Sequence, residues 1–443
     1  LTFQSFSSFN ANESAGISYI YDGLQRKVSE TVTDGGTILT EYLSGNKIKV
    51  TDAGKNLNNV QHSTTTTYLA YGNPQYDQPT MIESPESVTT TLDVNVFGDI
   101  EQITQSGSFD YVDAQGRTVT DFVSETEYRA YDSLHRLCQI ERNDVGSTVM
   151  KYNDIGEDIW QAEGQVASSH SSCNTNAALA SKVNYTYNNL GSNYQISYGD
   201  GTPPRTYNYD DNGNIISISS EDSLQIYSYN SLGLLEAESL SIDNKTFNLD
   251  YRYTPLGHLA SLQYPDGLAP VKFDTNAFGQ ARQAIRSYND NTPDGTFVKG
   301  SKNRATYYPN GSIDTFVYGN DIVHKTRLNS RQLPEQITDK LGSSDKVNLT
   351  YSYDNNNNIT SIFNTRNSGA YNLTNLTYDG LNRLTTTTGN NGIGSSSLSY
   401  DSLGNILTYS NNSATGSHQL SYSYTNNRLT GLTGIGSSRY NFS

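Results

Sequence analysis

The stretch YSYDNNNNITSI at residues 351–362 places two tyrosines on alternate positions, then an aspartate and four asparagines, then two isoleucines. The tyrosines would lie on one face of a β-strand, because side chains alternate with a period of two. Asp354 begins a turn, since its carboxylate can accept hydrogen bonds from nearby backbone N–H groups. Asn357 tolerates the positive φ that a tight turn needs, and Ile359 begins a return strand. The stretch therefore predicts a strand, a turn and a second strand.

The same pattern recurs along the chain about every 22 residues, and a second turn signal (YGDG at 198, YPDG at 264, YPNG at 308) lies between the units. Each period thus holds two short strands and two turns. This predicts an all-β fold of tandem antiparallel β-hairpins that form a long coiled ribbon, each unit burying its aromatic face against its neighbours. The predicted repeat-forming residues are Tyr131, Asp132, Tyr209, Gly213, Tyr229, Gly233, Tyr253, Gly257, Tyr353, Tyr378, Asp379, Tyr400, Asp401 and Gly404.

Tyrosine dominates the apolar part of the composition, with 34 Tyr against 13 Phe and 1 Trp in 443 residues. A hydrophobic content of 34% and a net charge of -16 are typical of disorder. Disordered chains are poor in aromatic residues, however, and a tyrosine can bury its ring while its hydroxyl stays hydrated. We therefore expect a folded chain in which the tyrosines stack between units as the core.

The charge balance narrows the range of partners. The chain has 45 acidic and 29 basic residues and no Lys/Arg cluster, which disfavours nucleic acid and anionic membrane surfaces. No apolar stretch approaches the roughly 20 residues that span a bilayer, so no membrane-spanning segment is expected. LTFQSFSSFN at the start is not a signal peptide, and the chain stops in mid-pattern, so we expect a piece of a longer protein.

The repeated unit of this sequence resembles the RHS, or YD, repeat. The closest matches are YDGLNRL (378–384), YDSLGNI (400–406) and YDSLHRL (131–137), with YPDG (264–267) as the accessory element. The resemblance implies a β-ribbon coiled into a hollow shell or barrel, as in bacterial polymorphic toxins, toxin-complex C subunits and teneurins. It also implies a secreted or cell-surface bacterial protein that encloses a toxin-like cargo domain. This domain would be either a C-terminal part of the same protein or a separate partner.

The array divides into two parts of unequal regularity. Residues 1–110 are β-prone and Thr-rich with degenerate repeats, and residues 111–443 form the regular array. Inserts interrupt it near 161–182 and 286–303. The first insert is expected to project from the wall, with a short helix at its alanine-containing end.

No complete catalytic motif is present, and no cofactor or metal site is expected. Cys138 and Cys173 could pair in an oxidising compartment, but they have no metal-ligand spacing. His324, Lys325 and Arg327 form the one candidate site, since histidine and arginine together could serve a polysaccharide lyase. Alternation along a strand would place His324 and Lys325 on opposite faces, which favours an ordinary exposed ribbon.

Three functions remain open from the sequence. The first is a structural shell that encloses or scaffolds a cargo domain of a larger protein, and it involves no enzyme activity of the repeats. The second is an extracellular adhesive or recognition scaffold, or a filament, whose loops bind carbohydrate or a cell surface. The third is a polysaccharide lyase built on repeats.

Overall fold

The computed structural model describes residues 2–6, 15–55, 61–69, 78–112, 116–166, 169–174, 181–265, 267–287, 295–299, 304–366, 371–390, 393–414, 416–435 and 440–441. The strands of the first sheet are β1 Phe3–Ser5, β2 Gly16–Tyr21, β3 Lys27–Val32, β4 Thr37–Leu43, β5 Lys47–Lys55, β6 Gln61–Tyr68, β7 Pro79–Glu83, β8 Val88–Val94, β9 Ile100–Val112, β10 Thr118–Tyr131, β11 Leu137–Arg142, β12 Gly146–Tyr152, β13 Asp158–Gln165, β14 Lys182–Tyr187, β15 Asn193–Tyr198, β16 Arg205–Tyr209, β17 Ile215–Ser219, β18 Ser223–Tyr229, β19 Leu235–Ile242, β20 Lys245–Tyr253, β21 Leu259–Gln263, β22 Val271–Thr275, β23 Ala281–Arg286 and β24 Gly295–Val298. Those of the second sheet are β25 Thr306–Tyr307, β26 Ile313–Val317, β27 Val323–Leu328, β28 Pro334–Leu341, β29 Ser344–Tyr353, β30 Ile359–Asn364, β31 Leu373–Tyr378, β32 Leu384–Gly389, β33 Ser395–Tyr400, β34 Ile406–Ser413, β35 Gly416–Thr425, β36 Arg428–Ile435 and β37 Tyr440–Asn441.

The opening stretch folds as the sequence predicts. Residues up to Tyr353 form β29, and β30 begins at Ile359. The two strands pair antiparallel with a register shift where Tyr353 meets Ile359, which is a bulge beside the turn. Asn357 has a φ of 68° and occupies the left-handed position of that turn.

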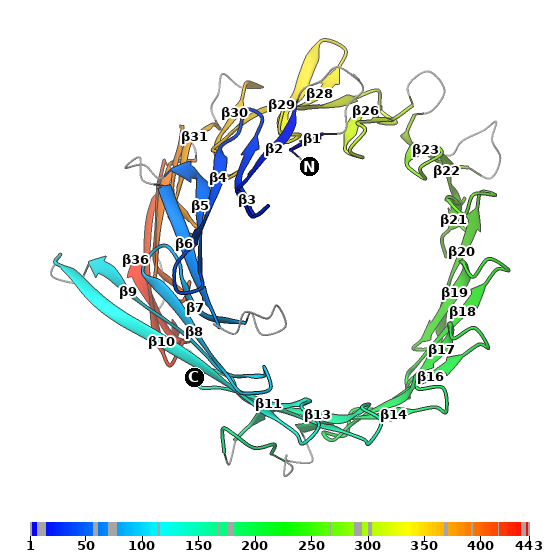
Figure 1. The fold of residues 1–443 in the computed structure, drawn as a ribbon. Coiled ribbons are helices and arrows are strands. Elements are labelled where there is room, and N and C mark those ends of the chain that lie inside the picture. The colour runs from blue at the N-terminus through cyan, green and yellow to red at the C-terminus, as the bar shows by residue number, and fades with distance from the viewer. Residues whose placement is uncertain are drawn as a thin grey trace.

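Within each sheet every strand pairs antiparallel with the next one along the chain, so each sheet is a continuous ribbon of hairpins. A single bridge between Val298 and Tyr318 connects the first sheet to the second. Figure 1 shows that this ribbon follows a ring-like path and that its C-terminal strands return beside its N-terminal ones. We call the first sheet (β1–β24) the first coil and the second sheet (β25–β37) the second coil.

The ribbon forms a thin wall. Its accessible surface is 26024 Å², whereas a compact monomer of 48.8 kDa exposes about 17,000 Å². The largest buried apolar cluster of the described residues joins only Val149, Trp160 and Ala162, with Ile159 packed against it. Together these observations confirm the predicted fold class, an all-β ribbon of hairpins with a shell-like course.

The structure describes parts of both expected inserts. β13 extends to Gln165, because its residues pair with β12 as far as the Ser147–Gln165 pair, so the first loop begins later than 161. The helix expected at the alanine-containing end of this insert lies outside the described residues. Within the second insert, residues 295–298 form β24. β9 crosses the proposed boundary at residue 110 and pairs with β10 beyond it.

Candidate functional site: the turn edge of the coiled ribbon

Most of the described turns along one long edge of the ribbon are of a single type. The first residue donates its N–H to the carbonyl of the fifth, and the fourth donates its N–H to the carbonyl of the first. In the turn at 354–358, Oδ1 of Asp354 also accepts hydrogen bonds from the N–H groups of Asn356 (2.9 Å) and Asn358 (2.8 Å). We call this edge the YD edge, and its turns span 22–26, 95–99, 132–136, 153–157, 188–192, 210–214, 230–234, 254–258, 276–280, 308–312, 329–333, 354–358, 379–383 and 401–405.

The fourth residue of these turns has a positive φ whatever its type. Gly213 has a φ of 83°, and His135 occupies the same position with a φ of 60°. A non-glycine residue in this region is uncommon. His135 is held there by a hydrogen bond of 2.8 Å between its Nδ1 and Oδ2 of Asp99, and by a ring contact with Phe97 at 4.3 Å.

In most of these units a tyrosine stands directly before the turn, and its hydroxyl links the hairpin to the preceding one. Tyr253 donates to the carbonyl oxygen of Leu235, the first residue of β19, at 2.7 Å. Because the bulge displaces that first residue from the ladder, the hydroxyl provides the partner for its carbonyl. The same bond joins Tyr131 to Ile100, Tyr152 to Leu137, Tyr187 to Asp158, Tyr209 to Asn193, Tyr229 to Ile215, Tyr307 to Ala281, Tyr353 to Pro334, Tyr378 to Ile359, Tyr400 to Leu384 and Tyr424 to Ile406.

The expected ring-on-ring stacking of tyrosines is wrong for these units. The ring pairs that tyrosines make among the described residues involve phenylalanine or histidine, as in Tyr128 with His170. The reason is geometric: equivalent tyrosines lie two strands apart, about 10 Å across the sheet, which is too far for ring contact. The hydroxyl bridges this distance because it lies at the far end of the ring.

Burial raises the pKa of several linking tyrosines, among them Tyr209, Tyr253 and Tyr378, above the ordinary value. Tyr251, which is not a linking tyrosine, shows a larger shift: burial and a hydrogen bond of 2.6 Å to Glu238 raise its pKa to about 12. The folded ribbon therefore favours the protonated phenol, which is the form that can donate the linking hydrogen bond.

An arginine strengthens the link in several units. Nε of Arg136 bonds to Oδ2 of Asp132 in its own turn at 2.7 Å, and Nη1 donates to the carbonyl of Asn153 in the next turn at 2.7 Å. Its guanidinium also lies 4.8 Å from the ring centroid of Tyr152. Arg383 repeats the arrangement with Asp379, Asp401 and Tyr400. The sequence did not identify this role, although both arginines occupy the fifth position of their turns.

The two coils meet along a seam, visible in Figure 1 where β30, β31 and β36 lie beside the N-terminal strands. The YD edge of the second coil contacts the opposite edge of the first coil, which we call the plain edge; its turns include 33–36, 84–87, 143–145, 220–222, 243–244 and 342–343. The seam bonds include Gly54 N to Asn356 Oδ1 (2.6 Å), Gly380 N to Glu86 Oε1 (2.8 Å), Ser402 Oγ to the Ser108 carbonyl (3.1 Å) and Asn427 Nδ2 to Asp144 Oδ2 (3.5 Å). These partners are 302, 294, 294 and 283 residues apart, so one circuit of the coil takes roughly 290 residues.

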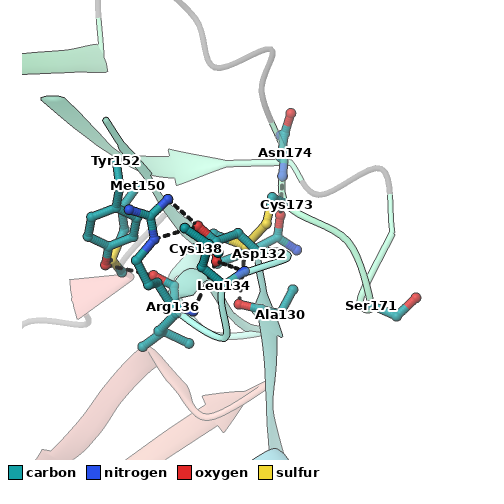
Figure 2. Close-up of a disulfide and its surroundings, with 12 residues drawn as sticks. Ala130, Asp132, Leu134, Arg136, Cys138, Met150, Tyr152, Ser171, Cys173 and Asn174 are labelled. Carbon is teal, nitrogen blue, oxygen red and sulfur yellow. Dashed lines mark hydrogen bonds and ion pairs between the residues drawn. A yellow bond between two sulfur atoms is a disulfide. The ribbon is translucent and has the colours of Figure 1, made fainter. Parts of the chain in front are cut away.

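The described part of the first insert is fastened to the sheet, as Figure 2 shows. A disulfide joins Cys138 of β11 to Cys173, with 5.4 Å between their Cα atoms. Gln139 is fully buried beside it, donating from Nε2 to the Ser169 carbonyl (2.8 Å) and accepting from the Asn174 N–H (3.1 Å). The sequence left this pairing open, because spacing alone does not show that two cysteines 35 residues apart meet.

A second contact holds the same segment from the side. The ring of His170 stacks on Tyr128 with 4.3 Å between centroids, and its Nδ1 lies 2.8 Å from Oε2 of Glu141. Residues 169–174 thus cover the sheet where its most buried residues lie, rather than projecting freely.

The structure separates the candidate lyase residues. Nδ1 of His324 lies 2.8 Å from Oδ1 of Asp339, and the ring stacks on Phe316 at 4.6 Å. Lys325 and Arg327 lie on the other face of β27, where both are exposed and Arg327 pairs with Glu335 at 3.1 Å. His324 and Arg327 are therefore not placed to act on one substrate.

Two further features are absent from the part of the chain that the structure describes. There, no three His, Cys, Asp or Glu side chains gather in a way that could hold a metal ion. The same residues contain no helix of the length and apolarity needed to cross a bilayer.

The fold and its edges define a class of protein, a coiled ribbon of tyrosine-linked β-hairpins whose successive coils join edge to edge. No protein-family model matches the sequence, and no curated protein sequence matches it. Solved structures do match: the Tc holotoxin pore of Photorhabdus luminescens (14% identity, TM-score 0.66), the TcdB2-TccC3-TEV structure (13%, 0.69) and TcdB2-TccC3 without its hypervariable C-terminal region (14%, 0.66). At such identities the likeness shows the fold, which agrees with the resemblance to RHS/YD-repeat proteins.

Each match covers 95% of this chain. The chain itself spans only 22% or 23% of the length of those matched chains. The likeness therefore concerns one section of much larger proteins.

Proposed function

We propose that the chain forms part of the wall of a protein shell that encloses or holds a toxin-like cargo domain in a secreted bacterial protein. The observation that carries this proposal is the seam: a thin ribbon that returns on itself after roughly 290 residues and bonds edge to edge makes a continuous wall. The likeness to toxin-complex structures supports it at the level of the fold. In this function the repeats act by enclosure, without catalysis.

The wall is tested by solution scattering on the 443-residue chain. We expect a radius of gyration well above the roughly 22 Å of a compact protein of this length, and a distance distribution typical of an open ring. A radius of gyration near that of a compact globule would contradict the proposal that the chain forms a thin wall.

Enclosure is tested with a compact, protease-sensitive reporter domain joined after Ser443. We expect the reporter to be cleaved more slowly than the same domain alone, and the protection to fall when the seam is opened by Gly380→Leu. Equal cleavage rates for the joined and the free reporter would contradict enclosure while leaving the wall intact.

A further inference from the structure

The YD edge of the first coil carries a row of exposed apolar side chains. They occupy the third position of successive turns, which we call the tip residue. Eight of these tips are apolar, and their exposed fractions lie between 61% and 88%. They are Leu24, Phe97, Leu134, Ile155, Leu190, Leu232, Leu256 and Phe278. Asn212 shows that a polar residue also fits this position.

Four of the five equivalent tips of the second coil are covered, whereas the fifth, Asn310, is exposed. Arg331, Asn356, Leu381 and Leu403 are partly buried, since their turns rest on the plain edge of the first coil. Two glycines at the same place in identical YDGL turns show this difference between the exposed and the covered edge. A Cβ at Gly23 would meet nothing within 4 Å, whereas one at Gly380 would lie 2.7 Å from Cβ of Pro85.

The seam therefore shows that a YD edge fits against a plain edge. The chain carries a further stretch of plain edge that is uncovered, which we call the free plain edge. The plain-edge turns at 220–222, 243–244 and 342–343 expose Asp222, Asp243 and Gly342 to solvent. Like the covered plain-edge turns at 33–36 and 84–87, they are short and close to the sheet, so a neighbouring edge can approach them.

We propose that the apolar tip row of the first coil docks on the free plain edge of a second copy of this chain, so that copies join end to end and extend the coil. One chain supplies both complementary surfaces, in the relationship its own seam already realises. Such an interface is heterologous, because two different surfaces meet in it. Each copy can therefore bind a further copy, and the assembly can grow. A row of exposed apolar side chains of this length is a typical mark of an interaction surface. The proposal is independent of any cargo.

Charge sets the conditions under which the association is strongest. The tips are uncharged, but each copy has a net charge of -16 and the free plain edge is acidic. Repulsion between copies is screened by salt, whereas contact between the tips is not. Association is therefore expected to strengthen as ionic strength rises.

The test is sedimentation velocity on the 443-residue chain over a range of protein and salt concentrations. We expect a concentration-dependent dimer and longer species, with end-to-end stacks in negative-stain images. The triple variant Leu190→Asn, Leu232→Asn, Leu256→Asn copies the natural Asn212 turn, so folding is preserved. It should raise the dissociation constant at least about tenfold.

The matched control is Phe122→Asn, because Phe122 is as exposed as Leu134 (61% each) but lies in β10, away from the tips. It should associate like the parent chain. A parent chain that stays monomeric at high concentration and high salt would overturn the proposal. So would a triple variant that associates as the parent does, or a control that loses association equally.

Discussion

The hydroxyl of Tyr209 donates a hydrogen bond of 2.6 Å to the carbonyl oxygen of Asn193, the first residue of the return strand in the preceding hairpin. Tyr207 lies on the same face of the same strand, and no hydroxyl partner is described for it. Two tyrosines two residues apart thus have different roles. One joins neighbouring hairpins through a directed bond, and the other contributes its ring to the face of the sheet.

Replacing Tyr209 by phenylalanine should therefore weaken the ribbon locally. The ring is retained, but the Asn193 carbonyl loses its partner, which costs about 1 kcal/mol or somewhat more for a half-buried group. We expect faster amide exchange in β15 and β16 and a lower midpoint in urea.

The control for this prediction is Tyr207→Phe, which removes a hydroxyl from the same strand without breaking a described bond. It should leave the midpoint within about 0.5 kcal/mol of the parent chain. If the two variants were equally destabilised, the hydroxyl link would not be the cause.

Gly380 is expected to be far more sensitive to enlargement than Gly23, although both follow the aspartate of a YDGL turn. A side chain at Gly380 would collide with the His62 ring and Pro85, and displacing packed neighbours costs about 1–3 kcal/mol. Gly380→Leu should open the seam and increase the radius of gyration in solution scattering. Gly23→Leu should leave it unchanged; identical behaviour of the two variants would mean that the seam does not form in solution.

Reducing the disulfide should release the segment at 169–174 while leaving the distant hairpins in place. Opening a loop of this length removes about 4 kcal/mol of stabilisation in the chain-entropy view. Hydrogen exchange should rise at Gln139 and over 169–174, and stay constant in β18–β20. The double variant Cys138→Ala, Cys173→Ala should match the reduced chain, and unchanged protection at 169–174 would show that the other contacts suffice.

Alkaline pH should unfold the ribbon by a mechanism that involves its tyrosines. Burial raises the pKa of several of them in the folded state, including Tyr209 and Tyr378, so the folded chain holds these phenolic protons more tightly than the unfolded chain, whose tyrosines titrate near pH 10. This stabilisation is fully present below about pH 10 and is lost as pH rises through the folded values, which reach about 12 at Tyr251. Tyrosinate absorbance and loss of the strand signal in circular dichroism should appear together; ionisation near pH 10 with intact strands would contradict this.

Local chemistry made much of the fold predictable. Alternating tyrosines, a turn-starting Asp or Asn and a residue that tolerates positive φ define a hairpin within about a dozen residues, as in 351–362. Repetition of that signal then predicted the ribbon. His135 shows the limit, because its left-handed conformation is supported by Asp99, which lies 36 residues away.

The features that join hairpins and coils could not be inferred in the same way. The seam pairs residues such as Glu86 and Gly380, and nothing in the local pattern of either indicates the other. The tyrosine hydroxyl link was missed because its acceptor is a backbone carbonyl, which has no sequence signature. The separation of His324 from Arg327 follows from strand alternation, which the sequence did indicate.

The length of one circuit also orders the events of biosynthesis. Each hairpin contacts its immediate neighbours, so it can form as soon as it leaves the ribosome, at low cost in loop entropy. The first bond across the seam needs partners roughly 290 residues apart, and must wait until that length of chain has emerged between them. Until then both edges of the young ribbon remain open to other chains, and this interval is when assembly with a neighbour competes with self-closure.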